Sequence, residues 1–337
     1  MLHELAHALT AHALGFRVFG IHLGLGKVLF SRQISGITWT VHMIPSSGVT
    51  LVAGPEMRQF RLRIFLIHLA GPAFHGLLIV LLLLMKSVFG FSGVWHGLIL
   101  WTNIFLVFFN LFPYKAHVAV GSTGTDGWAM LNAPRLTPEA LRMHYASFYI
   151  LETVSATENG DMQAAREIAE KGTALYPDDA NMRNALGYAY VNSRDYLKSR
   201  QIFLQALHSS ENLPIATNAM LLNNVAFANI MLDDPALLAE ADNFSEQAYE
   251  FLPWEPSITG TRGGVLVALD RPDEGIALLK GALSKNPDKR GKAIEACLIA
   301  WGEWKRGNSK ETESYLALAR QLDPECDLLE YIQNKTH

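Results

Sequence analysis

Two long uncharged stretches dominate the hydrophobic pattern of the first third of the chain. The first runs from Ile64 to Met85, and its 22 residues would form about 33 Å of helix. The second lies between Ser87 and Tyr114. Each is long enough to cross a hydrocarbon layer of roughly 30 Å. We therefore predict membrane-spanning helices at about residues 64–85 and 93–113. The alternative, two buried helices of a large soluble protein, is disfavoured because only a short turn separates them.

The segment before these runs changes pattern at Gly15. Residues 1–14 favour a helix, which at about 21 Å is too short to cross a membrane. Residues 16–52 carry glycines among β-branched and aromatic residues, and the alternation from Ile37 to Ile44 predicts a strand that stops at Pro45. We expect a small β-rich insertion at the cytoplasmic face of the membrane.

From about Thr137 onward, apolar residues recur at helical spacing between short polar turns. A 34-residue register links Asp161 to Asp195, and Pro253 to Pro287. This pattern resembles the tetratricopeptide repeat, in which paired helices stack into a solenoid, and it predicts four to five repeats. The predicted fold is thus a membrane α-helical domain with a small β-rich insertion (residues 1–136), followed by an all-α repeat solenoid (residues 137–337).

Charge divides the 337-residue chain in the same way. Residues 1–137 hold nine Lys/Arg and three Asp/Glu, a net charge of +6, whereas the rest holds 19 and 29, a net charge of −10. Cytoplasmic flanks of membrane spans keep basic residues. Only one of those flanking the spans, Lys86, lies between them. We therefore expect an integral, multi-pass membrane protein whose helical hairpin has its open ends, and the repeats, in the cytoplasm.

Other classes are excluded by composition. The two cysteines, Cys297 and Cys326, show no metal-binding spacing, and they fit a reducing compartment. The first residues carry no basic segment or cleavage site of a signal peptide. The basic residues flank spans instead of alternating with aromatics in a patch, so no nucleic acid partner is expected. The bilayer itself is the expected partner of the first domain.

The motif that carries chemistry is His3-Glu4-Leu5-Ala6-His7. On a helix, the i and i+4 spacing places both imidazoles on one face, where they can bind one Zn²⁺ ion. Zinc lowers the pKa of a bound water to about 7, and the intervening Glu4 can take a proton from it. A catalytic zinc ion requires a third protein ligand. Glu56 and Asp126 are the other carboxylates of this region, and Asp126 could instead be an N-cap or Asx-turn residue.

Residues 1–131 resemble the site-2 protease family of intramembrane zinc metalloproteases. The resemblance rests on these features in order: the HExxH motif, the glycine-rich segment 19–27, the strand ending at 44–49, Ala70-Gly71-Pro72, and Asn110-Leu111-Phe112-Pro113 followed by Asp126-Gly127. It implies one Zn²⁺ per chain held by His3, His7 and Asp126, with Glu4 as general base. It further implies cleavage in or beside a transmembrane segment of a partner protein. The strand near 37–49 would hold that substrate extended by β-augmentation.

The sequence also departs from the family. Its members usually have an apolar stretch before HExxH, so we expect either a start further upstream or a frayed site with weak metal retention. The insert between Asn110 and Asp126 contains His117, which we interpret as a bystander to the site and which could otherwise be an alternative ligand. His12, His22, His42, His68 and His96 are interpreted as packing or interfacial residues rather than ligands. His68 and His75 lie within the first span, so they should face protein or water, where they could support the metal ligands.

The function predicted from the sequence is zinc-dependent intramembrane endopeptidase activity, with repeats that bind a substrate or regulator. Repeat grooves commonly bind peptides, and the acidic balance would favour a basic one unless it serves solubility alone. The alternative is an inactive membrane-anchored scaffold that binds partners through its repeats. A soluble HExxH protease is disfavoured by the two predicted spans.

Overall fold

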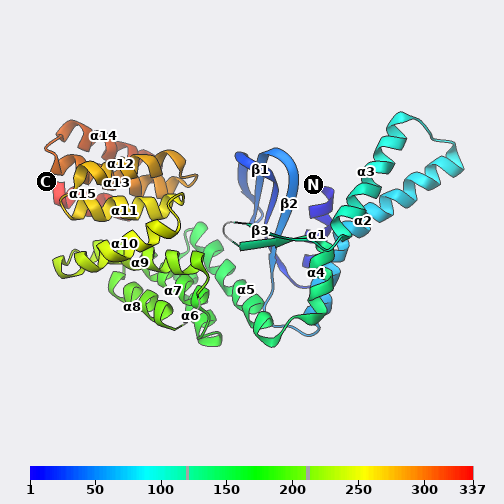
Figure 1. The fold of residues 1–337 in the computed structure, drawn as a ribbon, viewed down its shortest axis with the longest axis horizontal. Coiled ribbons are helices and arrows are strands. Elements are labelled where there is room, and N and C mark those ends of the chain that lie inside the picture. Colours follow the sequence, from blue (N-terminus) through cyan, green and yellow to red (C-terminus); the bar gives the residue numbers. More distant parts are fainter. Residues whose placement is uncertain (119–120, 210–212, 337) are drawn as a thin grey trace. The chain divides into compact units, whose positions relative to one another are not determined.

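The computed structural model describes residues 1–118, 121–209 and 213–336. Two compact units are present, Met1–Ser155 and Ala156–His337 (Figure 1). The division lies later than residue 136 because most of helix α5 (Pro138–Glu158) packs with the first unit. Leu141 and Tyr145 of α5 pack on the core of that unit, and Arg17 forms an ion pair with Glu152.

The core of the first unit forms where α1 (Leu2–Ala13) packs against α2 (Phe60–Phe89). Its buried residues are apolar and come from α1, from the first strand and the residue before it, and from α2: Ala8, Ala11, Phe16, Val18, Ile21, Phe60 and Ile67. Helix α3 (Val94–Leu111) returns alongside α2, and the short α4 (Asp126–Asn132) packs against α2 as well. A 3₁₀ turn at Ala133–Arg135 leads on to α5. Helix α2 thus contacts both α1 and α4.

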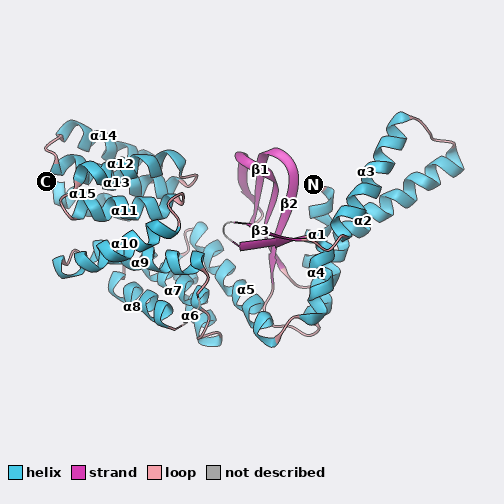
Figure 2. Cartoon of the chain, viewed as in Figure 1, coloured by secondary structure: helices cyan, strands magenta, loops and turns pink. Residues whose placement is uncertain are grey.

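Strands occur only in the first unit among the described residues (Figure 2). Strands β1 (Arg17–Ile34) and β2 (Ile37–Ala53) form a long, curled hairpin, and β3 (Lys115–Val118) pairs with β4 (Gly121–Gly124). The expectation that the strand stops at Pro45 is wrong, because β2 continues through it. Leu23 opposes Gly48 while Leu25 opposes Ile44, so Pro45 lies in a bulge, where a missing N–H is tolerated.

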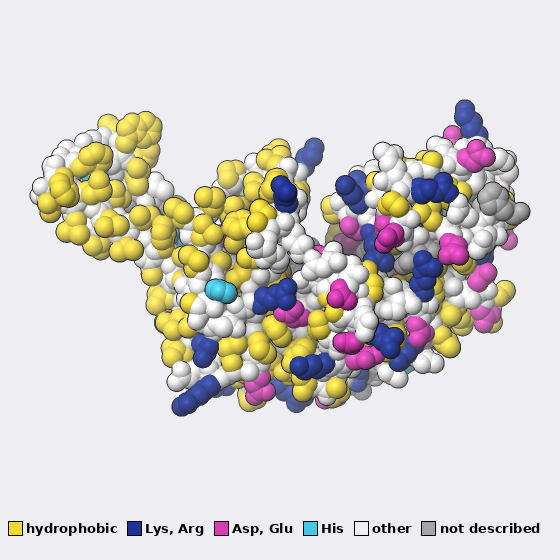
Figure 3. Space-filling model, turned by 180° about the vertical axis from the view of Figure 1, so that it is seen from behind, with side chains coloured by type: hydrophobic (Ala, Val, Ile, Leu, Met, Phe, Trp, Pro, Cys, Tyr) yellow, Lys and Arg dark blue, Asp and Glu magenta, His cyan; other side chains and the backbone are white. Residues whose placement is uncertain are grey.

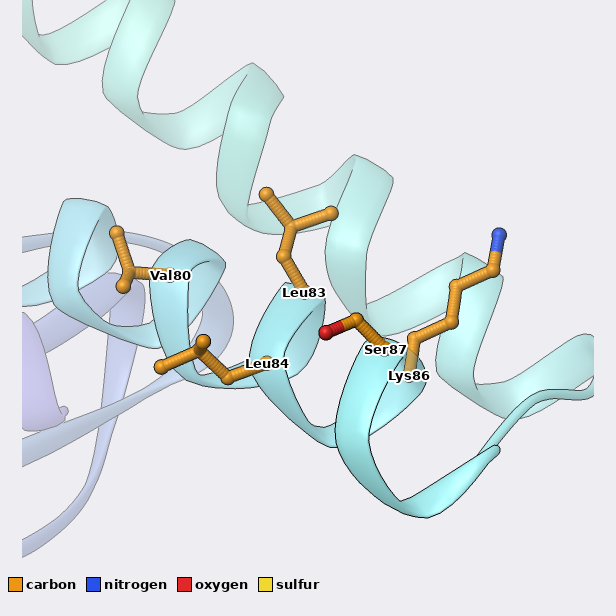
Figure 4. Close-up of a pocket in the computed structure, with 5 residues that line it drawn as sticks. All are labelled: Val80, Leu83, Leu84, Lys86 and Ser87. Atoms are coloured by element: carbon orange, nitrogen blue, oxygen red, sulfur yellow. The ribbon is translucent and has the colours of Figure 1, made fainter.

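The α2–α3 hairpin has an apolar surface. Of the residues in their most hydrophobic windows, only 17% in α2 and 11% in α3 are buried. Figure 3 shows hydrophobic side chains covering this hairpin. A shallow depression on α2, lined by Val80, Leu83, Leu84, Lys86 and Ser87, is formed by that helix alone (Figure 4). The exposure of so much apolar surface indicates association with a membrane.

A third helix in the described part of the chain is long and apolar enough to cross a membrane by length and composition. This is α9 (Ile215–Leu232), but 61% of its hydrophobic window is buried. Its residues Ala219, Leu222 and Val225 pack in the core of the second unit. High hydropathy therefore reflects burial against neighbouring helices in α9, whereas in α2 and α3 the apolar residues are exposed on the surface.

The second unit is a stack of helix pairs, as the repeat pattern predicts. Successive helices pack as α7/α8, α9/α10, α11/α12 and α13/α14. A 3₁₀ turn at Pro235–Leu237 precedes α10. The bounds of the remaining helices are α6 Met162–Leu175, α7 Ala180–Asn192, α8 Tyr196–His208, α10 Leu238–Phe251, α11 Pro256–Ala268, α12 Pro272–Lys285, α13 Lys289–Lys305, α14 Ser309–Leu322 and α15 Asp327–Thr336.

The repeat register has a physical basis in helix capping and close packing. Asp161 and Asp195 are N-caps whose carboxylates accept hydrogen bonds from backbone N–H groups three residues later, at Ala164 and Lys198. Gly187 faces the ring of Phe203 so closely that a Cβ atom could not fit there. Small residues therefore allow the two helices of a pair to approach each other.

Candidate metal centre

Helix α1 presents His3 and His7 on one face, and α4 brings Asp126 to the same point. The Nε2 atoms of the two histidines lie 3.0 Å apart, and Asp126 Oδ2 lies 3.1 Å from Nε2 of His3 and 3.4 Å from Nε2 of His7. Within the described part of the chain, these three side chains form a set that could hold a metal ion. The three residues singled out from the sequence are therefore brought together.

Two glycines make this convergence possible. A Cβ atom on Gly71 of α2 would lie 2.6 Å from Nε2 of His3 and closer still to Nε2 of His7. A Cβ atom on Gly127 would collide with the backbone of Leu111 at the end of α3. Gly71 thus leaves room for both imidazoles, and Gly127 allows α4 to start directly beside α3, which positions Asp126.

The spacing of the ligand atoms fits a tetrahedral zinc site. Zinc bonds of roughly 2.0–2.1 Å place neighbouring ligand atoms about 3.3 Å apart. The three observed separations, 3.0, 3.1 and 3.4 Å, lie close to that value. Two imidazole nitrogens and a carboxylate oxygen are also ligand types that zinc prefers. The residues present therefore fit a zinc ion with an open fourth position.

His7 is oriented by the backbone of α2. Its Nδ1 atom lies 2.6 Å from the carbonyl oxygen of Ile67 and donates to it, which directs Nε2 at the cluster. Burial lowers the pKa of His7, but the hydrogen bond with Asp126 and its negative charge raise this pKa by more, so the net shift is upward. Nδ1 of His3 is buried without a hydrogen-bond partner among the described residues. The backbone thus fixes His7 more firmly than His3.

Asp126 is not the N-cap of α4. Thr125 takes that position, and its hydroxyl accepts from the N–H of Trp128. The carboxylate of Asp126 is left to contact histidines, with Oδ1 lying 3.0 Å from Nδ1 of His68. Burial would raise the pKa of Asp126, but hydrogen bonds from His3, His68 and His7 outweigh it and hold that pKa well below its usual range. The group is therefore an ionised carboxylate at neutral pH.

Glu4 of α1 is buried against β2, with 7% of its surface exposed. The hydroxyl of Thr50 in β2 donates to Glu4 Oε2 at 2.7 Å and also lies 3.1 Å from the Glu4 carbonyl oxygen. A Cβ atom on Gly48 would lie 2.7 Å from Cδ of Glu4, so glycine lets the strand pass directly over the carboxylate. Strand β2 and the carboxylate are therefore in direct contact.

The other histidines fall into separate environments. His75 Nδ1 lies 2.6 Å from Asn103 Oδ1, which joins α2 to α3, and its ring centroid lies 5.3 Å from that of His3. His96 reaches the Leu82 carbonyl and His42 that of Gly26. The side chain of His117 lies outside the described residues, although its backbone pairs with Ser122 in the β3–β4 hairpin. Of the described side chains in this group, that of His68 contacts Asp126.

Some contributors to the site had no readable signal in the sequence. The carbonyl of Ile67 is a backbone group, and Thr50 is one of several hydroxyl residues in β2. Gly71 had a signal, because a glycine directly before Pro72 within an apolar helix has the poorest helix propensity after proline. A glycine at this position indicates that another part of the chain approaches the helix closely, but the sequence does not show that His3 and His7 do so.

Three comparisons with known proteins bear on this site and on the repeats. Residues 1–93 match peptidase family M50, a region that includes His3, Glu4, His7 and Gly71. A Chlamydia pneumoniae protein that bears a provisional zinc-metalloprotease name is 36% identical over 56 residues, which is 17% of this chain and 9% of that protein. The chain thus matches about a tenth of the length of this relative.

Solved structures resemble the repeat region. TTC0263, a tetratricopeptide-repeat protein of Thermus thermophilus, is 17% identical, with a TM-score of 0.44 over 56% of this chain and 97% of its own. YrrB, described as a tetratricopeptide-repeat protein with an unusual peptide-binding site, is 18% identical, with a TM-score of 0.35 over 56% and 92% of the two chains. The match of residues 1–93 to peptidase family M50 confirms the resemblance inferred from the motifs.

Proposed function

We propose that this protein is a zinc-dependent endopeptidase that cleaves a transmembrane or membrane-proximal segment of a partner protein. The observation that carries the proposal is the convergence of His3, His7 and Asp126, with the buried Glu4 on the same helix as the two histidines. The family match to residues 1–93 supports a metalloprotease activity. The apolar α2–α3 hairpin supports a substrate located in or near a membrane.

In this proposal, Nε2 of His3, Nε2 of His7 and Oδ2 of Asp126 would hold one zinc ion. When bound, zinc supplies a Lewis acid that activates water and polarises a peptide carbonyl. Glu4 accepts the proton of the attacking water and passes it to the departing amine as general base and then general acid. Thr50 holds the Glu4 carboxylate in place through its 2.7 Å hydrogen bond. His68 holds Asp126 through Oδ1, whereas His3 and His7 contact Oδ2.

Strand β2 offers a place for an extended substrate. A helical peptide bond hides its carbonyl in an i to i+4 hydrogen bond, so a transmembrane substrate must unwind before hydrolysis. A strand edge can hold such an unwound segment by β-augmentation. Within the strand near 37–49, residues 38–41 already pair with residues 20–23 and with residues 30–33. The contact of Gly48 and Thr50 with Glu4 therefore supports this role for the later part of the strand, from Gly48 onward. A substrate paired there would lie beside the general base.

The proposal also covers topology and the repeats. Basic residues outside the α2–α3 turn support an integral, multi-pass protein whose open hairpin ends and metal centre face the cytoplasm. The second unit would then lie in the cytoplasm. Its stacked helix pairs would bind a peptide or protein that is either a substrate or a regulator of cleavage.

The test compares Glu4→Gln with wild type in membranes. Glutamine keeps the shape and the Thr50 contact but cannot accept a proton. We expect Glu4→Gln to retain zinc and to abolish the new protein termini that wild type generates, as measured by terminus-specific mass spectrometry of membranes from expressing cells. The matched control is Glu56→Gln, an exposed carboxylate of the same unit, which should cleave normally. Undiminished cleavage by Glu4→Gln would refute the proposal.

A further inference from the structure

The second unit contains a cavity of about 310 Å³ between the first helices of successive pairs. Most of its lining residues come from α7, α9, α11 and α13 or from the turn before α13, and Thr157, Tyr196 and Leu328 also line it. Apolar wall residues include Val191, Phe227 and Leu298, whereas Asn223 and Glu295 are among the polar ones. This volume lies at the lower end of the range of small-ligand sites, roughly 300–1,000 Å³. The cavity thus has room for one side chain with an aliphatic stem, and nothing in the proposed protease site uses it.

Two hydrogen-bond acceptors in this wall have no donor among the described residues. They are Oε2 of Glu295 and Oδ1 of Asn223, in side chains only 3% and 4% exposed. A buried acceptor that is left without a donor destabilises the fold. Their neighbouring atoms are engaged, because Asn286 Nδ2 donates to Glu295 Oε1 at 2.9 Å and Asn223 Nδ2 donates to Asn224 Oδ1 at 3.1 Å. Oε2 of Glu295 and Oδ1 of Asn223 therefore each lack a donor in the described part of the chain.

The fold makes room for the buried carboxylate. A Cβ atom on Gly260 of α11 would lie 3.3 Å from Cγ and 3.4 Å from Oε1 of Glu295. Glycine at that position lets α11 pass close to the carboxyl group. The Glu295 side chain is therefore packed closely against α11.

The charged residues that line the cavity, within the described part of the chain, are Asp288, Arg290 and Glu295. Their sum is negative when both acids are ionised. Burial raises the pKa of Glu295 to about 7, partly opposed by the hydrogen bond from Asn286 and by the charge of Lys292, and aided by that of Asp288. An ionised Glu295 would gain from a cation placed beside it.

We propose that this cavity binds the side chain of a lysine or arginine presented by a protein segment, with Glu295 and Asn223 as its acceptors. This inference rests on the proposed recruiting role of the repeats and specifies the chemistry of the partner. An ammonium or guanidinium group only donates hydrogen bonds, which is what the two orphan acceptors require. The aliphatic stem of such a residue would pack against Val191, Phe227 and Leu298.

The test measures binding of fluorescein-labelled Ala-Ala-Lys-Ala-Ala to the full chain in detergent by fluorescence anisotropy. The same peptide with norleucine in place of lysine keeps the stem and removes the charge. We expect the lysine peptide to bind at least tenfold more tightly, and Glu295→Gln to remove that preference. The control is Glu303→Gln, a buried carboxylate of the same helix that pairs with Lys280 and Arg306 and does not line the cavity.

Equal binding of the two peptides, no binding of either below millimolar concentration, or an unchanged preference in Glu295→Gln would overturn the proposal. Binding of free 1,5-diaminopentane as tight as that of the lysine peptide would overturn the assignment to a protein segment. Binding is read without cleavage, so a failure here would leave the protease proposal intact. Conversely, Glu4→Gln should bind the lysine peptide as wild type does, even if no proteolysis is ever detected.

Discussion

The substitution Gly71→Ala tests whether the close approach of α2 to α1 serves the metal centre. The added methyl group would lie 2.6 Å from Nε2 of His3, whereas ordinary contact begins at about 3.4 Å. The imidazole must therefore retreat by roughly 0.8 Å, and His7 is crowded by the same atom. Ligand positions in a metal site tolerate only about 0.2 Å. We expect zinc affinity to fall at least 100-fold, which corresponds to about 2.8 kcal/mol.

The matched control is Gly76→Ala, on the same helix. A Cβ atom at Gly76 meets nothing within 4 Å, so this change should leave zinc affinity as in wild type. Because alanine favours helix over glycine by up to about 1 kcal/mol, the control should be as stable as wild type or more so. The assay is competition for zinc with a chelator of known affinity, using the full chain in detergent. Wild-type zinc affinity in Gly71→Ala would refute the argument that Gly71 makes room for the ligands.

Three further variants probe other contacts. His68→Ala should weaken zinc binding about 10–100-fold, because the Asp126 carboxylate loses its 3.0 Å partner, whereas His12→Ala on the exposed face of α1 should not; chelator competition distinguishes them. Thr50→Val should lower cleavage about tenfold at unchanged zinc content, since Glu4 loses a hydrogen bond, and normal cleavage would argue against that role. Glu295 has a pKa of about 7 in the folded state and 4.5 in the unfolded state. Between pH 4.5 and 7, the folded state therefore binds more protons at this residue than the unfolded state does. Unfolding free energy should therefore fall by up to roughly 3 kcal/mol as pH rises from 4.5 to 7, and urea titrations of Glu295→Gln should lack that slope.

Periodicity predicted the fold well because each element has a strong local signal. The uncharged runs predicted α2 and α3, and the 34-residue register corresponds to the N-caps Asp161 and Asp195. Pro45 misled the strand prediction, since a proline is compatible with a strand where a bulge removes the need for its N–H. Hydropathy alone also fails to separate α9 from α2, because both burial and membrane contact select apolar residues.

The sequence predicted only those site residues whose side chains can themselves bind a metal ion or transfer a proton. The spacing of His3 and His7 fixes their common face of α1, and Asp126 was one of two carboxylates left to join them. What holds them depends on tertiary contacts that no local pattern encodes. The Ile67 carbonyl orients His7, Thr50 holds Glu4, and Gly71 admits both rings. The partners in these contacts lie far apart in the chain, by 46 positions for Thr50 and Glu4 and by 60 for Ile67 and His7.

Zinc stoichiometry of the purified full chain tests the central claim most directly. We expect close to one zinc per chain by elemental analysis, and much less in Asp126→Ala, while Glu56→Ala, at the exposed carboxylate of the same unit, should match wild type. Absence of stoichiometric zinc from wild type, or an undiminished content in Asp126→Ala, would contradict the account and favour a membrane-anchored scaffold that binds partners through its repeats.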